Sequence, residues 1–214
     1  MKLIVPNLIQ EKDSTNCQAV TLQMVLHYFG DMVSIEEIMA GLNLYLVNKI
    51  GMHSEGPAIW AAQRGYKVTY RAHDLDVIDQ SIGRITEANT QNLKDKLGEL
   101  QESGNEYRRL KIKLDLDVIE SGASYSTEIT PLSFLDEMLK RKLPIIIGVR
   151  GKGLHMDPYR KGNHSIVVVG ADDNGFIVND PNPTNGAQYT IPRDELLMAW
   201  YINSARVLVI EKRV

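Results

Sequence analysis

The sequence predicts an α+β fold in which amino-terminal helices pack on a mainly antiparallel β-sheet. A polar stretch ending at Asn16 is followed by a strongly apolar run that reaches Gly30, which indicates a buried helix beginning at or next to Cys17. In the carboxy-terminal half, short apolar runs bounded by turn residues indicate strands at 145–149, 164–170, 176–179 and 205–210. Helices packed against such a sheet give this architecture.

The composition is that of an ordinary soluble globular protein of 214 residues, with 43% hydrophobic residues and a net charge of −3. This near-neutral balance gives no electrostatic case for nucleic-acid binding. A single cysteine excludes an internal disulfide framework and is compatible with a reducing compartment. No apolar run is long enough for a signal peptide or a membrane span. We therefore expect a cytoplasmic protein without a membrane segment, and its oligomeric state is left open.

Breakers and capping residues divide the rest of the amino-terminal part into short elements. Gly30 ends the first helix, and Gly41 is expected to end a second helix that opens at Ser34. A third helix is expected at 58–64 and a strand at 67–71. Further along, Thr130 and Pro131 indicate a helix start, with a capping hydroxyl followed by proline at the first helical position.

The middle of the chain departs from this compact pattern. We expect one domain over residues 1–214, with an inserted elaboration at about 74–130. Residues 93–110 are highly charged with only a thin apolar stripe, which is typical of an exposed helix, a lid or an interaction arm, or of a merely solvated surface. From Lys111 to Ile119 apolar and charged residues alternate, which predicts a half-buried strand.

The only cysteine, Cys17, has two interpretations. A lone cysteine is most often a small buried apolar residue. On the first turn of a helix, however, a thiol meets the positive end of the helix dipole and unpaired backbone N–H groups, both of which favour the thiolate. The four residues before it are of the types that cap helices: Asp13, Ser14, Thr15 and Asn16. This position favours a nucleophilic cysteine if suitable partners exist elsewhere.

A distant stretch supplies such partners. His164 opens an apolar strand, Asp173-Asn174-Gly175 predicts a tight turn, and Asp180 follows the returning strand. Cysteine, histidine and a carboxylate form the nucleophile, base and base-orienting group of a thiol enzyme.

The predicted hairpin complicates the pairing of these groups. Counting across its turn places position 164 opposite about 183–185, so Asp180 needs twist, a bulge or a different turn to reach His164. Asn179 and Asn182 are alternative orienting residues.

Both stretches resemble the bacteriocin-processing cysteine peptidases, which cut double-glycine leader peptides and are papain-like in fold. The helix matches the family pattern at Ala19, Leu22, Met24, Val25, Leu26, Tyr28 and Gly30. The strand and hairpin match at His164, Gly170, Asp180 and Pro181, with Asp180 sixteen residues after His164. The resemblance also takes in residues 51–66 and the last stretch from Pro192, but not the middle of the chain.

The resemblance implies a papain-like cysteine peptidase that cleaves a peptide or amide bond through a Cys17–His164–Asp180 triad and a thioester intermediate. It assigns Gln10 to the oxyanion hole, together with the Cys17 backbone N–H. Gln10 lies seven residues before Cys17, where the family usually has six, and Gln18 replaces the glycine that commonly follows the cysteine. The expected partner is a peptide or amide substrate, and no metal or organic cofactor is implied.

Two other functions stay open. Leader peptidases are usually fused to transporter and ATPase domains, which this sequence lacks, so an acyltransferase or amidase with the same triad is one alternative. The other is a catalytically silent domain that binds peptides in the cleft.

The remaining histidines give weaker signals for chemistry. His27 lies about 15 Å along the helix from Cys17, too far to be its base. His155 and Asp157 form only a weak candidate metal pair, and His53 and His73 belong to no motif.

Overall fold

The structure, a computed structural model, describes residues 1–12, 14–42, 46–47, 51–74, 91, 95, 99, 106–154, 162–184 and 188–212. Its helices are α1 (Cys17–Tyr28), α2 (Ile35–Leu42), α3 (Glu55–Gln63), α5 (Glu106–Glu120), α6 (Leu132–Lys140) and α7 (Arg193–Tyr201). Its strands are β1 (Leu46–Val47), β2 (Gly51–Met52), β3 (Lys67–Arg71), β4 (Ser124–Ser126), β5 (Ile145–Arg150), β6 (Asn163–Asp172), β7 (Gly175–Asn179), β8 (Gln188–Ile191) and β9 (Val207–Glu211).

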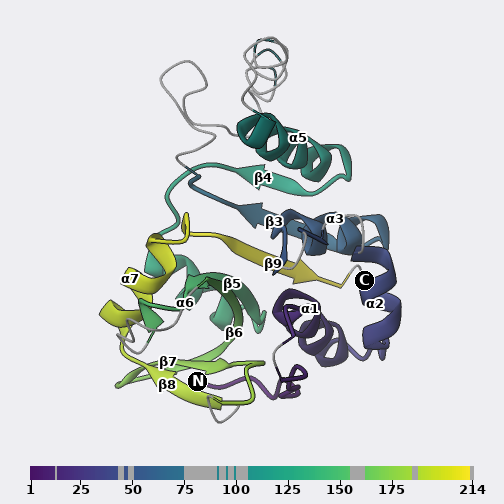
Figure 1. Cartoon of the computed structure of the whole chain (residues 1–214). Helices are drawn as coiled ribbons and strands as arrows, with labels where there is room; N and C mark the ends of the chain where they lie inside the picture. Colours follow the sequence, from purple (N-terminus) through teal and green to yellow (C-terminus); the bar gives the residue numbers. More distant parts are fainter. Residues whose placement is uncertain are drawn as a thin grey trace.

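The strands from β3 onward form one sheet in the order β4-β3-β9-β5-β6-β7-β8 (Figure 1). Strands β1 and β2 pair separately. Within the seven-stranded sheet every neighbouring pair runs antiparallel except β3 and β4, which run parallel. The predicted mainly antiparallel sheet is confirmed.

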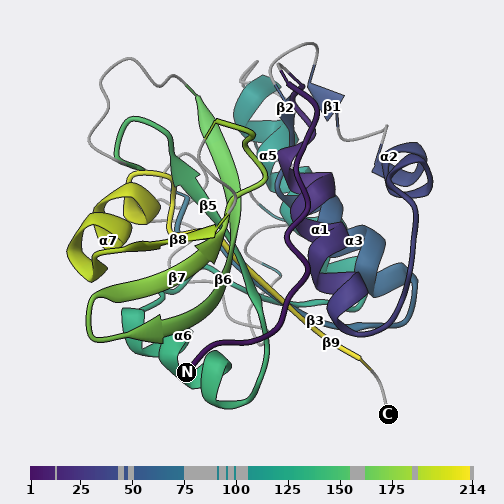
Figure 2. The same ribbon diagram turned by 90° about the horizontal axis from the view of Figure 1, so that it is seen from below.

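Helices lie on both sides of this sheet. Figure 2 shows α1, α2 and α3 together on one side, and α6 and α7 on the other. Helix α1 packs on β6, α3 packs on β3, and α7 packs on β5. This is the predicted α+β arrangement, with the amino-terminal helices on the sheet. None of the described helices is both long and apolar enough to cross a lipid bilayer.

Helix α1 is largely buried. Its apolar side chains from Ala19 to Leu26 point to more than one side and are almost fully enclosed, with Leu22, Met24 and Val25 all at 0% exposure. Burying a side chain of this size stabilises the fold by about 1.5–3 kcal/mol. Gly30, at a φ of 81°, ends the helix in the left-handed conformation that glycine adopts without cost. The first turn of α1, which carries Cys17, is therefore continuous with a helix that is packed into the core.

Residues 111–119 contradict the prediction of a strand, because they lie in helix α5. The alternation of apolar and charged residues predicts a strand only if the charged residues face water. Lys111 and Asp115 are in fact buried, together with Ile112 and Leu116 one turn apart. A helix with a wide buried face that includes paired charges produces the same alternation.

Two predicted helix boundaries were also wrong. Gly41 lies inside α2, next to its last residue Leu42, and a Cβ at this position would clash with the Trp60 ring. Pro131 is the residue before α6 and not its first, and the Thr130 hydroxyl has no hydrogen-bond partner, so it does not cap the helix. Most of the charged segment predicted at 93–110 falls outside the described residues.

Candidate active site

Cys17 is the first residue of α1, and its thiol is partly exposed. No side chain caps this helix: Asn16 is the N-cap residue, but its Oδ1 lies 2.6 Å from Ser14 Oγ. Ser14 and Asn16, although of the residue types that cap helices, therefore do not cap the backbone of α1 through their side chains, and Asp13 lies outside the described residues. The N–H groups of the first turn consequently remain available to a negatively charged group beside Cys17.

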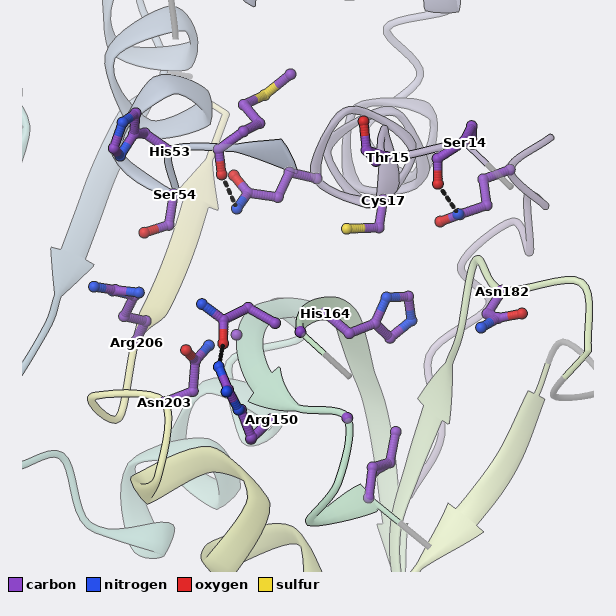
Figure 3. Close-up of a pocket in the computed structure, with 18 of the residues that line it drawn as sticks. Ser14, Thr15, Cys17, His53, Ser54, Arg150, His164, Asn182, Asn203 and Arg206 are labelled. Atoms are coloured by element: carbon purple, nitrogen blue, oxygen red, sulfur yellow. Dashed lines mark hydrogen bonds between the residues drawn. The ribbon is translucent and has the colours of Figure 1, made fainter. Parts of the chain in front are cut away.

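His164 reaches the thiol from the sheet. It lies at the start of β6, paired with Val149 of β5. Its Nε2 is 2.6 Å from Asp180 Oδ1, and the Cys17 thiol lies close enough to raise the pKa of the ring. Because Nε2 is engaged by the carboxylate, Nδ1 is the ring nitrogen left for the sulfur. Figure 3 shows Cys17 and His164 coming from α1 and β6, with the cleft between these two elements.

A β-bulge brings Asp180 to the histidine. The hairpin register shifts between Val168 and Gly170, so that Val168 pairs with Val178 and Val167 with Asn179. Continued past the end of β7, this register places residue 180 opposite Ile166, and His164 is then the diagonal neighbour on the same face. Counting across the turn predicts that Asp180 needs twist, a bulge or a different turn to reach His164, and the structure contains a bulge.

The Asp180 carboxylate is fully buried and held by several donors. Oδ1 accepts the Asn182 backbone N–H at 2.8 Å in addition to His164, and Oδ2 accepts the Tyr189 hydroxyl at 2.8 Å. Asn179 instead donates to the carbonyl of Val5 and therefore does not occupy the orienting position. Tyr189 was not identified from the sequence, because β8 is too short to give a recognisable pattern.

The electrostatics of His164 favour the imidazolium. Burial opposes a charge on the ring, but the hydrogen bonds to Asp180 and Cys17 outweigh it and raise the pKa of His164 from 6.5 to about 9. At neutral pH the ring is therefore protonated, which is the form that pairs with a thiolate and can give a proton to a leaving group.

A buried hydroxyl pair connects α1 to β6 next to these groups. Thr21 Oγ1 and Ser165 Oγ lie 3.0 Å apart and are both buried. Thr21 is one helical turn after Cys17, and Ser165 directly follows His164. This contact fixes the two elements relative to each other. Nothing in the sequence singled it out, because Thr21 stands in an otherwise apolar run.

Gln10 lies in the same cavity, with its position set by the segment around Asp180. Its backbone N–H donates to the Pro181 carbonyl at 2.8 Å, and its Nε2 donates to the Ser14 carbonyl at 2.9 Å. One Nε2 hydrogen is thus used within the loop, which leaves the second for another acceptor. Gln18 is held away from the thiol by donating its Nε2 to the Met52 carbonyl.

Among these residues, Gln10, Cys17, Gln18 and His164 line a cavity of about 800 Å³ between the helices and the sheet. Figure 3 shows Ser14 and Asn182 toward one end, with Cys17 and His164 between, and Arg206 toward the other end. A volume of this size accommodates several residues of an extended peptide or a small molecule.

The histidines with weaker signals for chemistry are not partners of Cys17 and His164 in the described residues. His27 Nε2 and Gln23 Nε2 both contact the Val33 carbonyl, each at 3.0 Å, which connects α1 to the start of α2. His73 contacts the Thr127 carbonyl. His53 lines the cavity without being part of the Cys17–His164 contact. His155 and Asp157, the weak metal candidates, lie outside the described residues.

Two solved structures of proteases have a similar arrangement of elements. A double-glycine motif protease from an AMS/PCAT transporter, solved with a leader peptide, matches with a TM-score of 0.50 and 15% identity over 99% of this chain and 94% of that one. The peptidase domain of Streptococcus ComA, a bifunctional ABC transporter in a quorum-sensing pathway, matches with a TM-score of 0.51 and 15% identity over 96% and 98%. At these identities the likeness establishes the papain-like fold.

The sequence comparisons give a family assignment as well. No curated protein matches the chain. A family model described as the Peptidase_C39 like family matches residues 2–207, which is nearly the whole sequence. The chain therefore belongs to the Peptidase_C39 like family.

Proposed function

We propose that this protein is a cysteine peptidase in which Cys17 is the nucleophile, His164 the general acid and base, and Asp180 the group that orients the histidine. The observation that carries the proposal is the arrangement at one cavity: Cys17 and His164 both line it, and His164 Nε2 is 2.6 Å from a fully buried carboxylate. Family membership supports the same chemistry.

In the proposed reaction the Cys17 thiolate attacks the carbonyl carbon of a peptide or amide bond. The C–N bond then breaks, His164 gives its proton to the leaving amine, and a thioester remains on Cys17. His164, now neutral, accepts a proton from a water molecule that attacks the thioester. The products are the free carboxylic acid and the regenerated thiol. The hydrogen bond from Nε2 to Asp180 keeps the other ring nitrogen directed at the sulfur throughout.

The oxyanion of the tetrahedral intermediate needs hydrogen-bond donors. We assign this role to the backbone N–H of Cys17, on the uncapped first turn of α1, and to the second Nε2 hydrogen of Gln10. A donor of this kind contributes about 3 kcal/mol to transition-state stabilisation in comparable enzymes.

The proposed substrate is a peptide bound across the cavity. The double-glycine motif protease, whose structure contains a leader peptide, is the basis for choosing peptides with adjacent glycines as the first substrates to test. We further propose that residues 1–214 form a single domain with an elaboration at about 74–130, and that the protein works in the reducing cytoplasm.

The test is peptide cleavage followed by mass spectrometry. Wild type and Cys17→Ala would each be incubated with a mixture of peptides that includes double-glycine sequences. Cleavage by wild type alone supports the proposal, and transfer of the acyl group to added hydroxylamine would demonstrate the thioester. Binding of peptides without cleavage by either protein would instead identify a silent peptide-binding domain.

A further inference from the structure

The described lining of the cavity carries positive charge. Lys111, Arg150 and Arg206 all contribute to it, and no lining residue among those described is an aspartate or a glutamate. Figure 3 shows Arg206 and Asn203 on the far side of Cys17 from Asn182. One end of the cleft therefore presents cations to a bound molecule.

The carboxylates that balance two of these cations lie behind them in the interior. Lys111 Nζ is 2.9 Å from Glu55 Oε1 and 3.4 Å from Asp74 Oδ2, and the Lys111 side chain is only 3% exposed. Arg206 Nη2 donates to Asp74 Oδ2 at 2.5 Å. Both carboxylates are buried and neither lines the cavity. These ion pairs hold the cations in fixed positions while their counter-charges stay on the side away from the cleft.

Donor capacity remains for a ligand at this end. Arg206 Nε is buried and has no hydrogen-bond partner. Arg150 donates Nη1 to the Asn163 amide oxygen at 2.8 Å, a neutral partner that does not offset its charge. In the protein interior, burial and then the charge of Glu55 raise the pKa of Asp115 to about 8. At neutral pH this side chain therefore adds little negative charge to the cluster around Lys111.

We propose that the part of the cleft lined by Arg150, Asn203 and Arg206 is a subsite for a carboxylate carried by the substrate. The inference rests on the proposed function only in taking the ligand to be a peptide that lies across Cys17. An acidic side chain and the C-terminal carboxylate of a short peptide share this chemistry, and guanidinium groups bind both through charge-assisted hydrogen bonds.

Cys17 provides an anchor for the test, through three bromoacetylated dipeptides used as alkylating agents. The first is neutral Ala-Gln amide, the second is Ala-Glu amide with a side-chain carboxylate, and the third is Ala-Gln with a free C-terminal carboxylate. Each second-order rate constant is divided by that for β-mercaptoethanol, which removes the intrinsic reactivity of the probe. We expect one carboxylate probe to react about tenfold faster than the neutral one, and the faster probe identifies the source of the carboxylate.

Matched arginine variants assign the preference to the subsite. Arg150→Gln removes a partly exposed cation from the cleft, and Arg64→Gln removes one outside it, where Arg64 pairs with Glu37. The faster reaction of the carboxylate probe should be mostly lost in Arg150→Gln and kept in Arg64→Gln. Arg206→Lys retains the charge beside Asp74 but lacks the Nε donor, and should lower the preference severalfold in a folded protein.

Two results would overturn the subsite. One is equal normalised rates for all three probes with wild type. The other is a preference that survives both Arg150→Gln and Arg206→Lys but disappears in His164→Ala, because the imidazolium alone would then attract the anion. The rate with the neutral probe reports activation of the thiol separately, so a failure of the proposed function is distinguishable from a failure of the subsite.

Discussion

Replacing Asp180 by asparagine should lower the pKa of His164 by at least one pH unit from about 9. In the wild type, burial of the ring is outweighed by the hydrogen bonds to Asp180 and Cys17, which together raise the pKa from 6.5 to about 9. At 1.36 kcal/mol per pH unit, this rise corresponds to a preference for the imidazolium of about 3 kcal/mol. Asparagine keeps the shape and an acceptor oxygen but removes the charge, so the ring loses part of that preference.

The assay is an NMR titration of protein labelled with ¹³C in the histidine rings, between pH 5 and pH 10. The chain has five histidines, and the His164 signal is identified by its loss in His164→Ala. Asp194→Asn, an exposed substitution on α7, is the matched control and should leave the His164 titration unchanged. A wild-type His164 that titrates near 6.5, or an equal pKa in wild type and Asp180→Asn, would refute the reasoning.

The same shift fixes the direction of the pH effect on stability. Because the folded-state pKa of His164 lies above its unfolded value of 6.5, the contribution of this group is fully present below pH 6.5 and is lost as the pH rises through about 9. The free energy of unfolding should therefore fall over this range in wild type, and fall less in Asp180→Asn.

Three further substitutions test the surroundings of the site. Thr21→Val leaves the buried Ser165 hydroxyl without its partner and should lower the free energy of unfolding by about 1–3 kcal/mol in urea denaturation, whereas Thr21→Ser should cost much less; equal costs would contradict the pairing. Lys111→Met leaves the buried Glu55 carboxylate without its cation and should lower the free energy of unfolding by about 3–5 kcal/mol. Much of this loss should be recovered in the double variant with Glu55→Gln, and an unchanged melting temperature in Lys111→Met would count against the ion pair. Tyr189→Phe removes a donor to the buried carboxylate beside His164 and should slow Cys17 alkylation by about tenfold while lowering the free energy of unfolding by about 1–3 kcal/mol; wild-type alkylation rates would show that the hydroxyl is dispensable for the site.

The sequence predicted the elements that carry the candidate triad because their signals are local. The apolar run after Asn16 marks α1, and the valine-rich run after His164 marks β6. The Asp173-Asn174-Gly175 turn then fixes the hairpin that leads to Asp180. The bulge that completes the approach to His164 depends on contacts across the sheet, so turn counting alone could only indicate that some irregularity was needed.

What the sequence failed to predict depends on contacts between distant residues. Residues 111–119, expected to form a strand, lie in a helix whose buried face includes Lys111; this lysine pairs with Glu55, 56 residues earlier, and no local pattern reveals such a partner. The Thr21–Ser165 pair joins residues 144 apart, and each hydroxyl alone is unremarkable in the sequence. The cationic end of the cleft likewise comes from cations on three separate elements, α5, β5 and the segment before β9.

The most direct test of the central claim, that His164 activates Cys17, is the rate of Cys17 alkylation by iodoacetamide at pH 6. A free thiol with a pKa of about 8.5 is only about 0.3% thiolate at this pH. We predict that wild type and His27→Ala, a control outside the site, react rapidly, and that His164→Ala reacts at the slow rate of a free thiol. Equal, slow alkylation of wild type and His164→Ala would contradict a thiolate–imidazolium pair and with it the proposed peptidase.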